Sequence, residues 1–167
     1  MSLIDFIRDA GENLFKHTPA AAASSHPTTT SAAPNQAALN GAAADAIGKY
    51  IASKGLPADK LTLAFDGANR TVRVSGTVPD QVTREKIVLC CGNVSSVEHV
   101  DDHMSVSNAG AASDYYTVKS GDTLSSIAKK FYDAANKYPA IFEANKPMLS
   151  DPDKIYPGQV LRIPKQA

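Results

Sequence analysis

The sequence has no excess of charge of either sign, and this absence excludes a broad class of ligands. Lys and Arg together number 17, as do Asp and Glu, so the formal net charge is zero. Proteins that bind nucleic acid usually carry a basic excess on one face. We therefore expect no nucleic-acid partner and no general attraction to anionic lipid.

Long apolar runs are also absent, since no stretch approaches the roughly 20 apolar residues that cross a membrane. The start, MSLIDFIRDAGENLF, lacks the basic beginning and uncharged apolar core of a secretory signal. We therefore expect a cytoplasmic protein without a transmembrane segment. The apolar residues of this start recur at helical spacing, which predicts a short amphipathic helix over residues 1–16. They are Leu3, Ile4, Ile7, Ala10 and Leu14.

Cysteine is scarce, because only the neighbours Cys90 and Cys91 are present. Adjacent cysteines on a helix point in different directions and pair poorly. No CxxC metal pattern or disulfide framework is available. We expect two small buried apolar side chains in a reducing compartment.

Composition divides the chain into separate parts. Residues 17–35 are rich in Ala, Thr, Ser and Pro and lack large apolar side chains, which predicts a flexible linker. A second soft segment spans residues 108–114. Two small domains are therefore expected, over residues 36–107 and 115–165, and each is near the size at which a core becomes marginal.

Periodicity in the first domain predicts the order α-β-β-α-β. A helix over residues 36–54 ends at Gly55, and two alternating strands, 61–65 and 71–78, flank a short turn. Pro79 and Asp80 open a second helix that ends at Gly92, and a strand follows over 97–107. The stripe expected on the first helix is Leu39, Ala43, Ala46, Ile47, Tyr50 and Ile51.

The second domain reads strand, helix, helix, strand, over 115–118, 122–132, 136–146 and 159–164. Asp122 or Ser120 is expected to cap its first helix, and Pro157-Gly158 to turn the chain into the closing strand. With its motifs YTV, GDTL, IA and IYPGQ-LRIP, this unit resembles a LysM domain over its whole length. That resemblance implies a sugar-binding groove between two loops. Its residues would be Gly121, Asp122, Thr123, Leu124, Pro147, Met148, Leu149 and Ile155.

Residues 36–107 resemble a BON domain, through the pattern Val72-x-Val74-x-Gly76 and the segment Val97 to Val106. Together with the start DFIRDAGE, the combination is similar to the bacterial cytoplasmic potassium-binding protein family. The resemblance implies an α+β protein with a BON and a LysM domain after the N-terminal helix. It also implies a bound K⁺, for which Rb⁺ or Cs⁺ can substitute.

A potassium ion is held well by several neutral carbonyl oxygens, and helix C-termini leave such groups unpaired. Two glycines, Gly11 and Gly92, stop predicted helices abruptly. The family resemblance points to the backbone carbonyls around these two stops. They belong to Ile7, Ala10, Glu12, Gly92, Val94 and Val97. Both glycines also fit ordinary helix caps, and Ser96 stands where the family leads us to expect glycine.

Other readings stay open at this stage. His99, Asp101 and His103 alternate on one strand face and offer three zinc ligands without a fourth.

No phosphate loop, HExxH motif or convincing catalytic triad is present, so we expect a binding protein rather than an enzyme. The expected role is reversible K⁺ binding and sensing, with LysM docked on BON within the chain. The alternatives are a protein that binds peptidoglycan or N-acetyl sugars, and an envelope or membrane adaptor.

Overall fold

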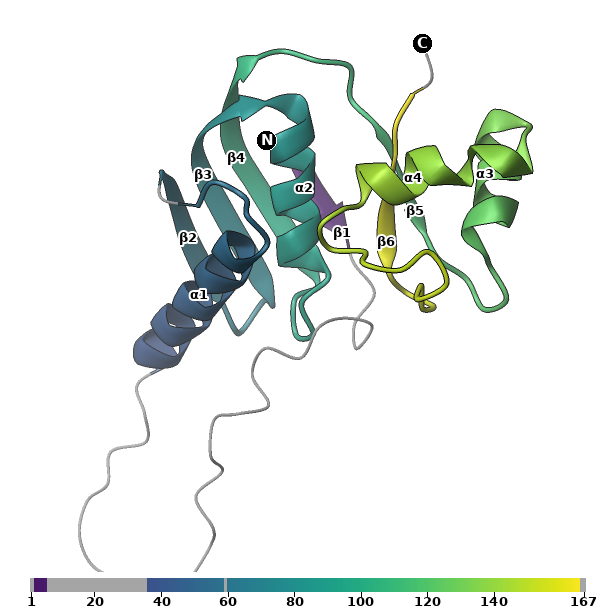
Figure 1. The fold of residues 1–167 in the computed structure, drawn as a ribbon. Helices are drawn as coiled ribbons and strands as arrows, with labels where there is room; N and C mark the ends of the chain where they lie inside the picture. Colours follow the sequence, from purple (N-terminus) through teal and green to yellow (C-terminus); the bar gives the residue numbers. More distant parts are fainter. Residues whose placement is uncertain (1, 6–35, 59, 166–167) are drawn as a thin grey trace, which may run out of the picture.

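The computed structural model describes residues 2–5, 36–58 and 60–165. The first domain contains a four-stranded sheet in the order β1-β4-β3-β2. Helices α1 and α2 cover one face of this sheet (Figure 1). The second domain pairs β5 with β6 and adds a short 3₁₀ turn, η1, and two helices, α3 and α4. The α+β class and both predicted element orders are confirmed.

The elements have the following bounds. In the first part of the chain they are β1 Ser2–Asp5, α1 Gln36–Ser53, β2 Leu61–Asp66, β3 Thr71–Asp80, α2 Gln81–Gly92 and β4 His99–Asn108. In the second part they are β5 Asp114–Thr117, α3 Leu124–Tyr132, η1 Ala135–Lys137, α4 Tyr138–Ala144 and β6 Val160–Ile163.

The N-terminal residues correct one prediction. Residues 2–5, expected within a helix, form strand β1, which pairs antiparallel with β4 from Ser2↔Asp102 to Asp5↔His99. A run of only four residues cannot be assigned by periodicity alone, and the unpaired edge of β4 supplies backbone partners that a helix does not need. Residues 6–16 of the predicted helix, and the predicted linker over 17–35, lie outside the described residues.

Local chemistry explains where the BON helices begin and end. Helix α1 ends in a Schellman motif, in which Gly55 has φ +71° and Leu56 N–H donates to the Ile51 carbonyl at 3.4 Å. Helix α2 is capped by Asp80, whose carboxylate accepts from Thr83 N–H at 2.7 Å. Pro79, expected in that helix start, is instead the penultimate residue of β3.

The sheet requires glycine at one position. Gly76 in β3 has φ +137°, and a Cβ built there would lie 2.4 Å from the Lys60 carbonyl oxygen. Only a residue without a side chain allows this close approach of two backbones. The predicted Val72-x-Val74-x-Gly76 pattern therefore has a physical basis, since both valines are fully buried under the helices.

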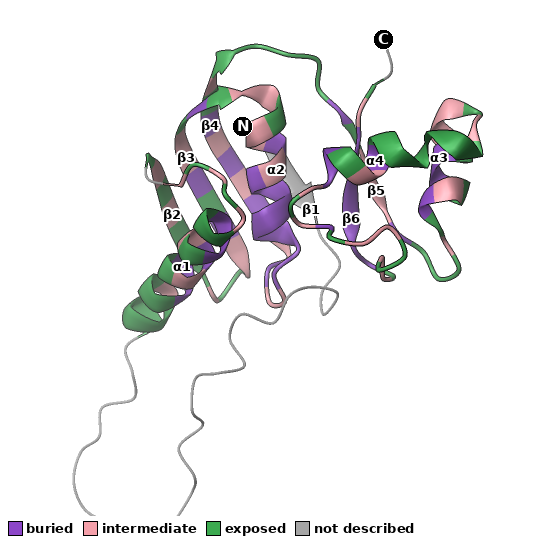
Figure 2. Ribbon diagram, viewed as in Figure 1, coloured by how far each residue is buried: buried purple, intermediate pink, exposed green. Residues whose placement is uncertain are grey.

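Burial divides the described residues into two apolar cores. The BON core lies between the sheet and the two helices, and the LysM core lies between β5, β6, α3 and α4. The C-terminal half of α2 is buried almost all round (Figure 2), because the sheet covers one side and β6 packs on another. Cys90 and Cys91 are fully buried there, as expected. Leu39, predicted in the α1 stripe, is 45% exposed, whereas Ile47 and Ile51 of the same stripe are fully buried.

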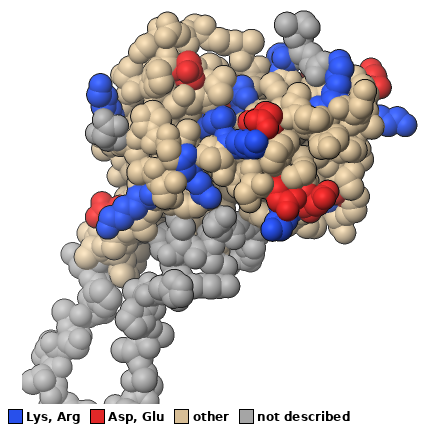
Figure 3. Space-filling model, viewed as in Figure 1, with Lys and Arg blue, Asp and Glu red and all other residues tan. Residues whose placement is uncertain are grey.

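Charged side chains do not gather by sign on the visible surface. On the face drawn in Figure 3, acidic groups lie next to basic ones. None of the helices in the described part of the chain has the length and apolar character needed to cross a membrane.

Candidate functional site

The candidate site begins at the C-terminus of α2. Asn93 is the C-cap residue, and its backbone N–H donates to the carbonyls of Leu89 and Cys91. Val94 N–H also donates to Cys91, at 3.3 Å. No basic side chain stands in the last turn of α2, so its own sequence leaves the negative end of the helix dipole uncompensated.

A tight turn follows over residues 94–97. Val97 N–H donates to the Val94 carbonyl at 3.1 Å, and Ser96 has φ +86°. These features match a type II turn, whose third position needs a positive φ and favours glycine. Ser96 therefore occupies a strained position, as expected if the family places glycine there.

The far end of this loop is anchored to the β2–β3 hairpin. The N–H groups of Glu98 and His99 both donate to the Arg70 carbonyl, at 2.8 and 3.2 Å. Arg70 also contacts the Glu98 carboxylate at 3.6 Å. The loop between α2 and β4 is thus fixed at both ends, by the helix and by the hairpin.

Three of the six predicted ion ligands lie at the end of α2 or in this loop. Gly92 is the last residue of α2, and the side chains of Val94 and Val97 are buried in the BON core. Val94 O accepts a hydrogen bond from Val97 N–H. Gly92 ends α2, so its carbonyl is one of those that have no partner within the helix. Gly92 does not have the positive φ of an ordinary glycine cap.

The other three predicted ligands, Ile7, Ala10 and Glu12, lie outside the described residues. The register of β1 nevertheless shows where the chain leaves the sheet. Asp5 pairs with His99, the first residue of β4, two positions after Val97. The end of β1 and the α2–β4 loop therefore lie at the same end of the sheet.

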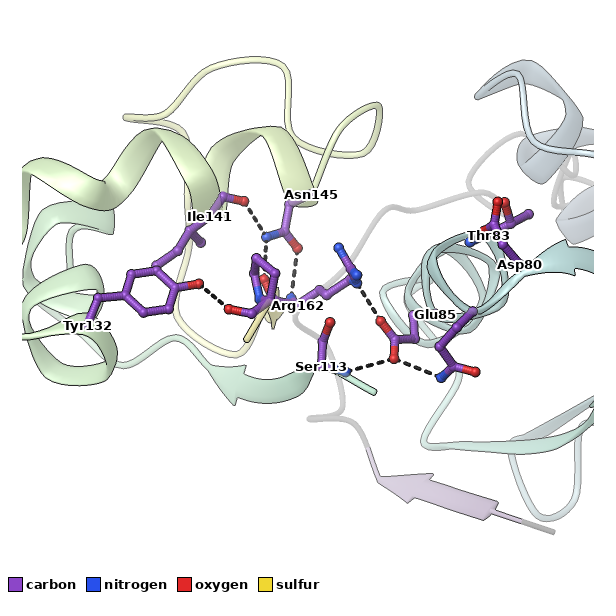
Figure 4. A network of polar contacts seen from close by, with 10 residues as sticks. Asp80, Thr83, Glu85, Ser113, Tyr132, Ile141, Asn145 and Arg162 are labelled. Atoms are coloured by element: carbon purple, nitrogen blue, oxygen red, sulfur yellow. Dashed lines mark hydrogen bonds and ion pairs between the residues drawn. The ribbon is translucent and has the colours of Figure 1, made fainter. Parts of the chain in front are cut away.

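The same helix carries a buried polar network that sequence analysis missed. Glu85 accepts from Arg162 Nε of β6 at 2.5 Å, and both side chains are less than 10% exposed (Figure 4). Gln81 and the Ser113 backbone N–H also donate to Glu85, at 2.8 and 2.9 Å. Burial would raise the pKa of Glu85, but the bonds from Arg162, Gln81 and Ser113 outweigh it and hold the pKa below its ordinary value.

The predicted sugar groove of the LysM unit is partly a packing feature. Leu124 and Leu149 are buried in the LysM core, Ile155 packs against that core, and Met148 packs against the BON core. Pro147, Gly121 and Thr123 are exposed, and Asp122 is half-buried. Leu124, Leu149 and Ile155 therefore serve the LysM core, whereas the turn at Gly121 to Thr123 lies at or near the surface.

The cap of α3 corrects a second prediction. Thr123, not Asp122 or Ser120, accepts from Ser126 N–H at 3.1 Å and forms a capping box with Ser126. Asp122 instead accepts from Lys119 N–H and Tyr116 OH, each at 2.8 Å. The bond from Lys119 N–H is the main reason that the pKa of Asp122 lies below its usual value.

The zinc alternative left open for His99, Asp101 and His103 gains no support from the described residues. Asp101 contacts Arg73 Nε and His103 Nε2, each at 2.8 Å, on the sheet face opposite the helices. Among the described residues, no group of three His, Cys, Asp or Glu side chains could hold a metal ion. Asp101 is thus compensated by basic neighbours.

Comparisons with known proteins agree with this architecture. Residues 36–108 match the model of the BON domain and residues 116–164 match that of the LysM domain. A protein of Escherichia coli O6:H1, described as "Potassium binding protein Kbp", is 43% identical over 167 residues, which cover 99% of this chain and 100% of that protein. An uncharacterized protein of Deinococcus radiodurans is 51% identical over 49 residues, or 29% of this chain and 19% of that protein.

Proposed function

Since the chain belongs to the family of the potassium binding protein Kbp, we propose that it binds K⁺ reversibly through backbone carbonyls and performs no catalysis. The observation that carries the proposal is the α2–β4 loop. The carbonyl of Gly92 has no partner within the helix that it ends, and Val94 and Val97 follow the negative end of the α2 dipole. Neutral carbonyls at a helix C-terminus suit a large monovalent cation better than Ca²⁺ or Mg²⁺, which favour carboxylates.

The rest of the shell would come from the N-terminal segment. Asp5 pairs with His99, and Ile7 follows Asp5 by only two residues, a span of at most about 7 Å of extended chain. The carbonyls of Ile7, Ala10 and Glu12 are therefore within chain reach of Gly92, Val94 and Val97. Together these six oxygens would complete the coordination of one ion.

Such a shell links ion binding to order. Carbonyl oxygens brought together without a cation repel one another, so the N-terminal segment would hold to the loop only when K⁺ is present. The free energy of ion binding then becomes free energy of ordering, which is the basis for sensing the K⁺ level. A cytoplasmic location would suit this role, because K⁺ is abundant there.

The LysM unit would act as a docking partner in this scheme. The Glu85–Arg162 pair and the packing of Met148 against the BON core support this role. A peptidoglycan-binding role rests on the match to the LysM model and on the exposed turn at Gly121 and Thr123. Retention of the purified protein on isolated cell wall would favour that alternative.

Thermal unfolding in matched chloride salts of K⁺, Na⁺, Rb⁺ and choline, at constant ionic strength, tests the proposal. An ion present at 100 times its dissociation constant stabilises the folded state by about 2.7 kcal/mol. We expect a higher midpoint in K⁺ and Rb⁺ than in Na⁺ and choline. Equal midpoints in the four salts would rule out the ion site.

A further inference from the structure

The side chain of Asn93 makes an unusual contact for a helix-capping residue. Its amide nitrogen donates to the Val160 carbonyl and its amide oxygen accepts from the Val160 N–H, each at 3.1 Å. Both bonds are buried, and they join residues 67 positions apart in the sequence. Asn93 lies between Gly92 and Val94, two of the proposed ion ligands.

The contact completes one edge of the LysM sheet. Strand β6 pairs with β5 on one side, and the backbone groups of Val160 and Arg162 face the other side. Asn145 of the LysM unit binds both backbone groups of Arg162, each at 2.8 Å, as Asn93 does for Val160. Two side-chain amides therefore take the place of a third strand, and one of them comes from the BON domain.

The side chain of Val160 also contacts the BON domain, in addition to the hydrogen bonds of its backbone. The side chain of Val160 is 3% exposed and belongs to the BON core, whereas Leu161 and Ile163 of the same strand belong to the LysM core. The first residue of β6 is thus held by the BON domain through both its backbone and its side chain. Movement of the loop at Gly92 would therefore change the contact at the start of β6.

We propose that Asn93 is a positioning residue that links occupancy of the carbonyl loop to the attachment of the LysM unit. This inference rests on the proposed function, since it assigns a regulatory contact to the same ion site. A cation that fixes the carbonyls of Gly92 and Val94 restrains the backbone on both sides of Asn93. Its amide is then held toward Val160, and by reciprocity a docked LysM unit favours ion binding.

The test uses the full chain and two matched variants. Asn93→Ala removes the pair of bonds to Val160, and Asn145→Ala removes the corresponding bonds to Arg162 without touching the loop. The K⁺ titration midpoint of each variant is measured from the backbone amide signals of residues 92–97. We expect the midpoint to rise about tenfold in Asn93→Ala, within the usual range of coupling between sites. In Asn145→Ala it should change less than about threefold, because that bond pair is not coupled to the loop.

Hydrogen exchange in the unmodified chain tests the link even if a variant fails to fold. With K⁺ at 100 times the midpoint, the amide of Val160 should exchange up to about 100-fold more slowly than in choline. The amide of Arg162, held by Asn145, should slow less. If the signals of residues 92–97 respond to K⁺ but both amides slow by the same factor or not at all, the link through Asn93 is overturned while the ion site stands. No response of residues 92–97 to K⁺ overturns both.

Discussion

The carboxylate of Glu85 in α2 and the guanidinium of Arg162 in β6 form a buried ion pair at 2.5 Å, 77 residues apart in the sequence. Their residues are 3% and 6% exposed. Removing one partner of such a pair leaves the other charge buried and uncompensated.

Replacing Glu85 with alanine should therefore be strongly destabilising. We expect Glu85→Ala to lower the free energy of unfolding by about 3–5 kcal/mol, because Arg162 stays buried without its partner. Urea denaturation measures the effect. The control is Glu143→Ala, which removes an exposed pair with Lys146 and should cost no more than about 1 kcal/mol. Similar losses in the two variants would contradict the importance of the buried pair.

The same carboxylate predicts a loss of stability in acid. The pKa of Glu85 is lower in the folded protein than in the unfolded chain, so its contribution is fully present above the unfolded value of about 4.3. It disappears as the pH falls from that value through the folded pKa. Urea unfolding from pH 7 to pH 3 should therefore show a smaller acid-induced loss in Glu85→Gln than in the unmodified chain. An identical pH profile for the two proteins would show that Glu85 makes no such contribution.

Ser96→Gly should stabilise the protein. A positive φ costs about 1–2 kcal/mol for a residue with a side chain, and glycine at position 96 would remove this cost. The greater freedom of glycine in the unfolded chain offsets part of the stabilisation. We expect a net gain of about 0.5–1 kcal/mol in urea unfolding. Ser95→Gly, at a neighbour without positive φ, should instead be neutral or destabilising. A gain in Ser95→Gly that matches that of Ser96→Gly would argue against strain at Ser96.

Thr123→Ala should weaken the LysM unit. The side chain of Thr123 satisfies Ser126 N–H, and loss of such a cap typically costs about 1 kcal/mol. Thermal unfolding of the variant measures the effect. The matched control is Ser120→Ala, since Ser120 is exposed and does not cap the helix. A larger loss in the control would restore Ser120 as the capping residue.

Removing residues 1–16 should abolish the stabilisation by K⁺, because the proposed shell takes half of its oxygens from Ile7, Ala10 and Glu12. The measurement is the difference in unfolding midpoint between K⁺ and choline. Shortening residues 20–33 serves as the control and should leave the difference intact, since these residues contribute no proposed ligand. A truncated chain that still responds to K⁺ would remove the N-terminal segment from the site.

Local signals in the sequence predicted most of the fold. The alternation in β2 and β3, the cap at Asp80 and the stop at Gly55 depend on near neighbours, so each could be recognised without the structure. Strand β1 could not, because its conformation depends on pairing with a strand about 100 residues away. The roles of Asn93 and Glu85 depend on similarly distant partners, and a polar residue on a helix ordinarily faces solvent.

The pair of amides along β6 has a further consequence for how the protein behaves at high concentration. A sheet edge with unsatisfied N–H and C=O groups is a template for the addition of strands from other molecules. Asn93 and Asn145 occupy those groups at Val160 and Arg162, so this edge offers no such template while the two domains stay together. Separation of the domains would uncover Val160, and self-association should begin there.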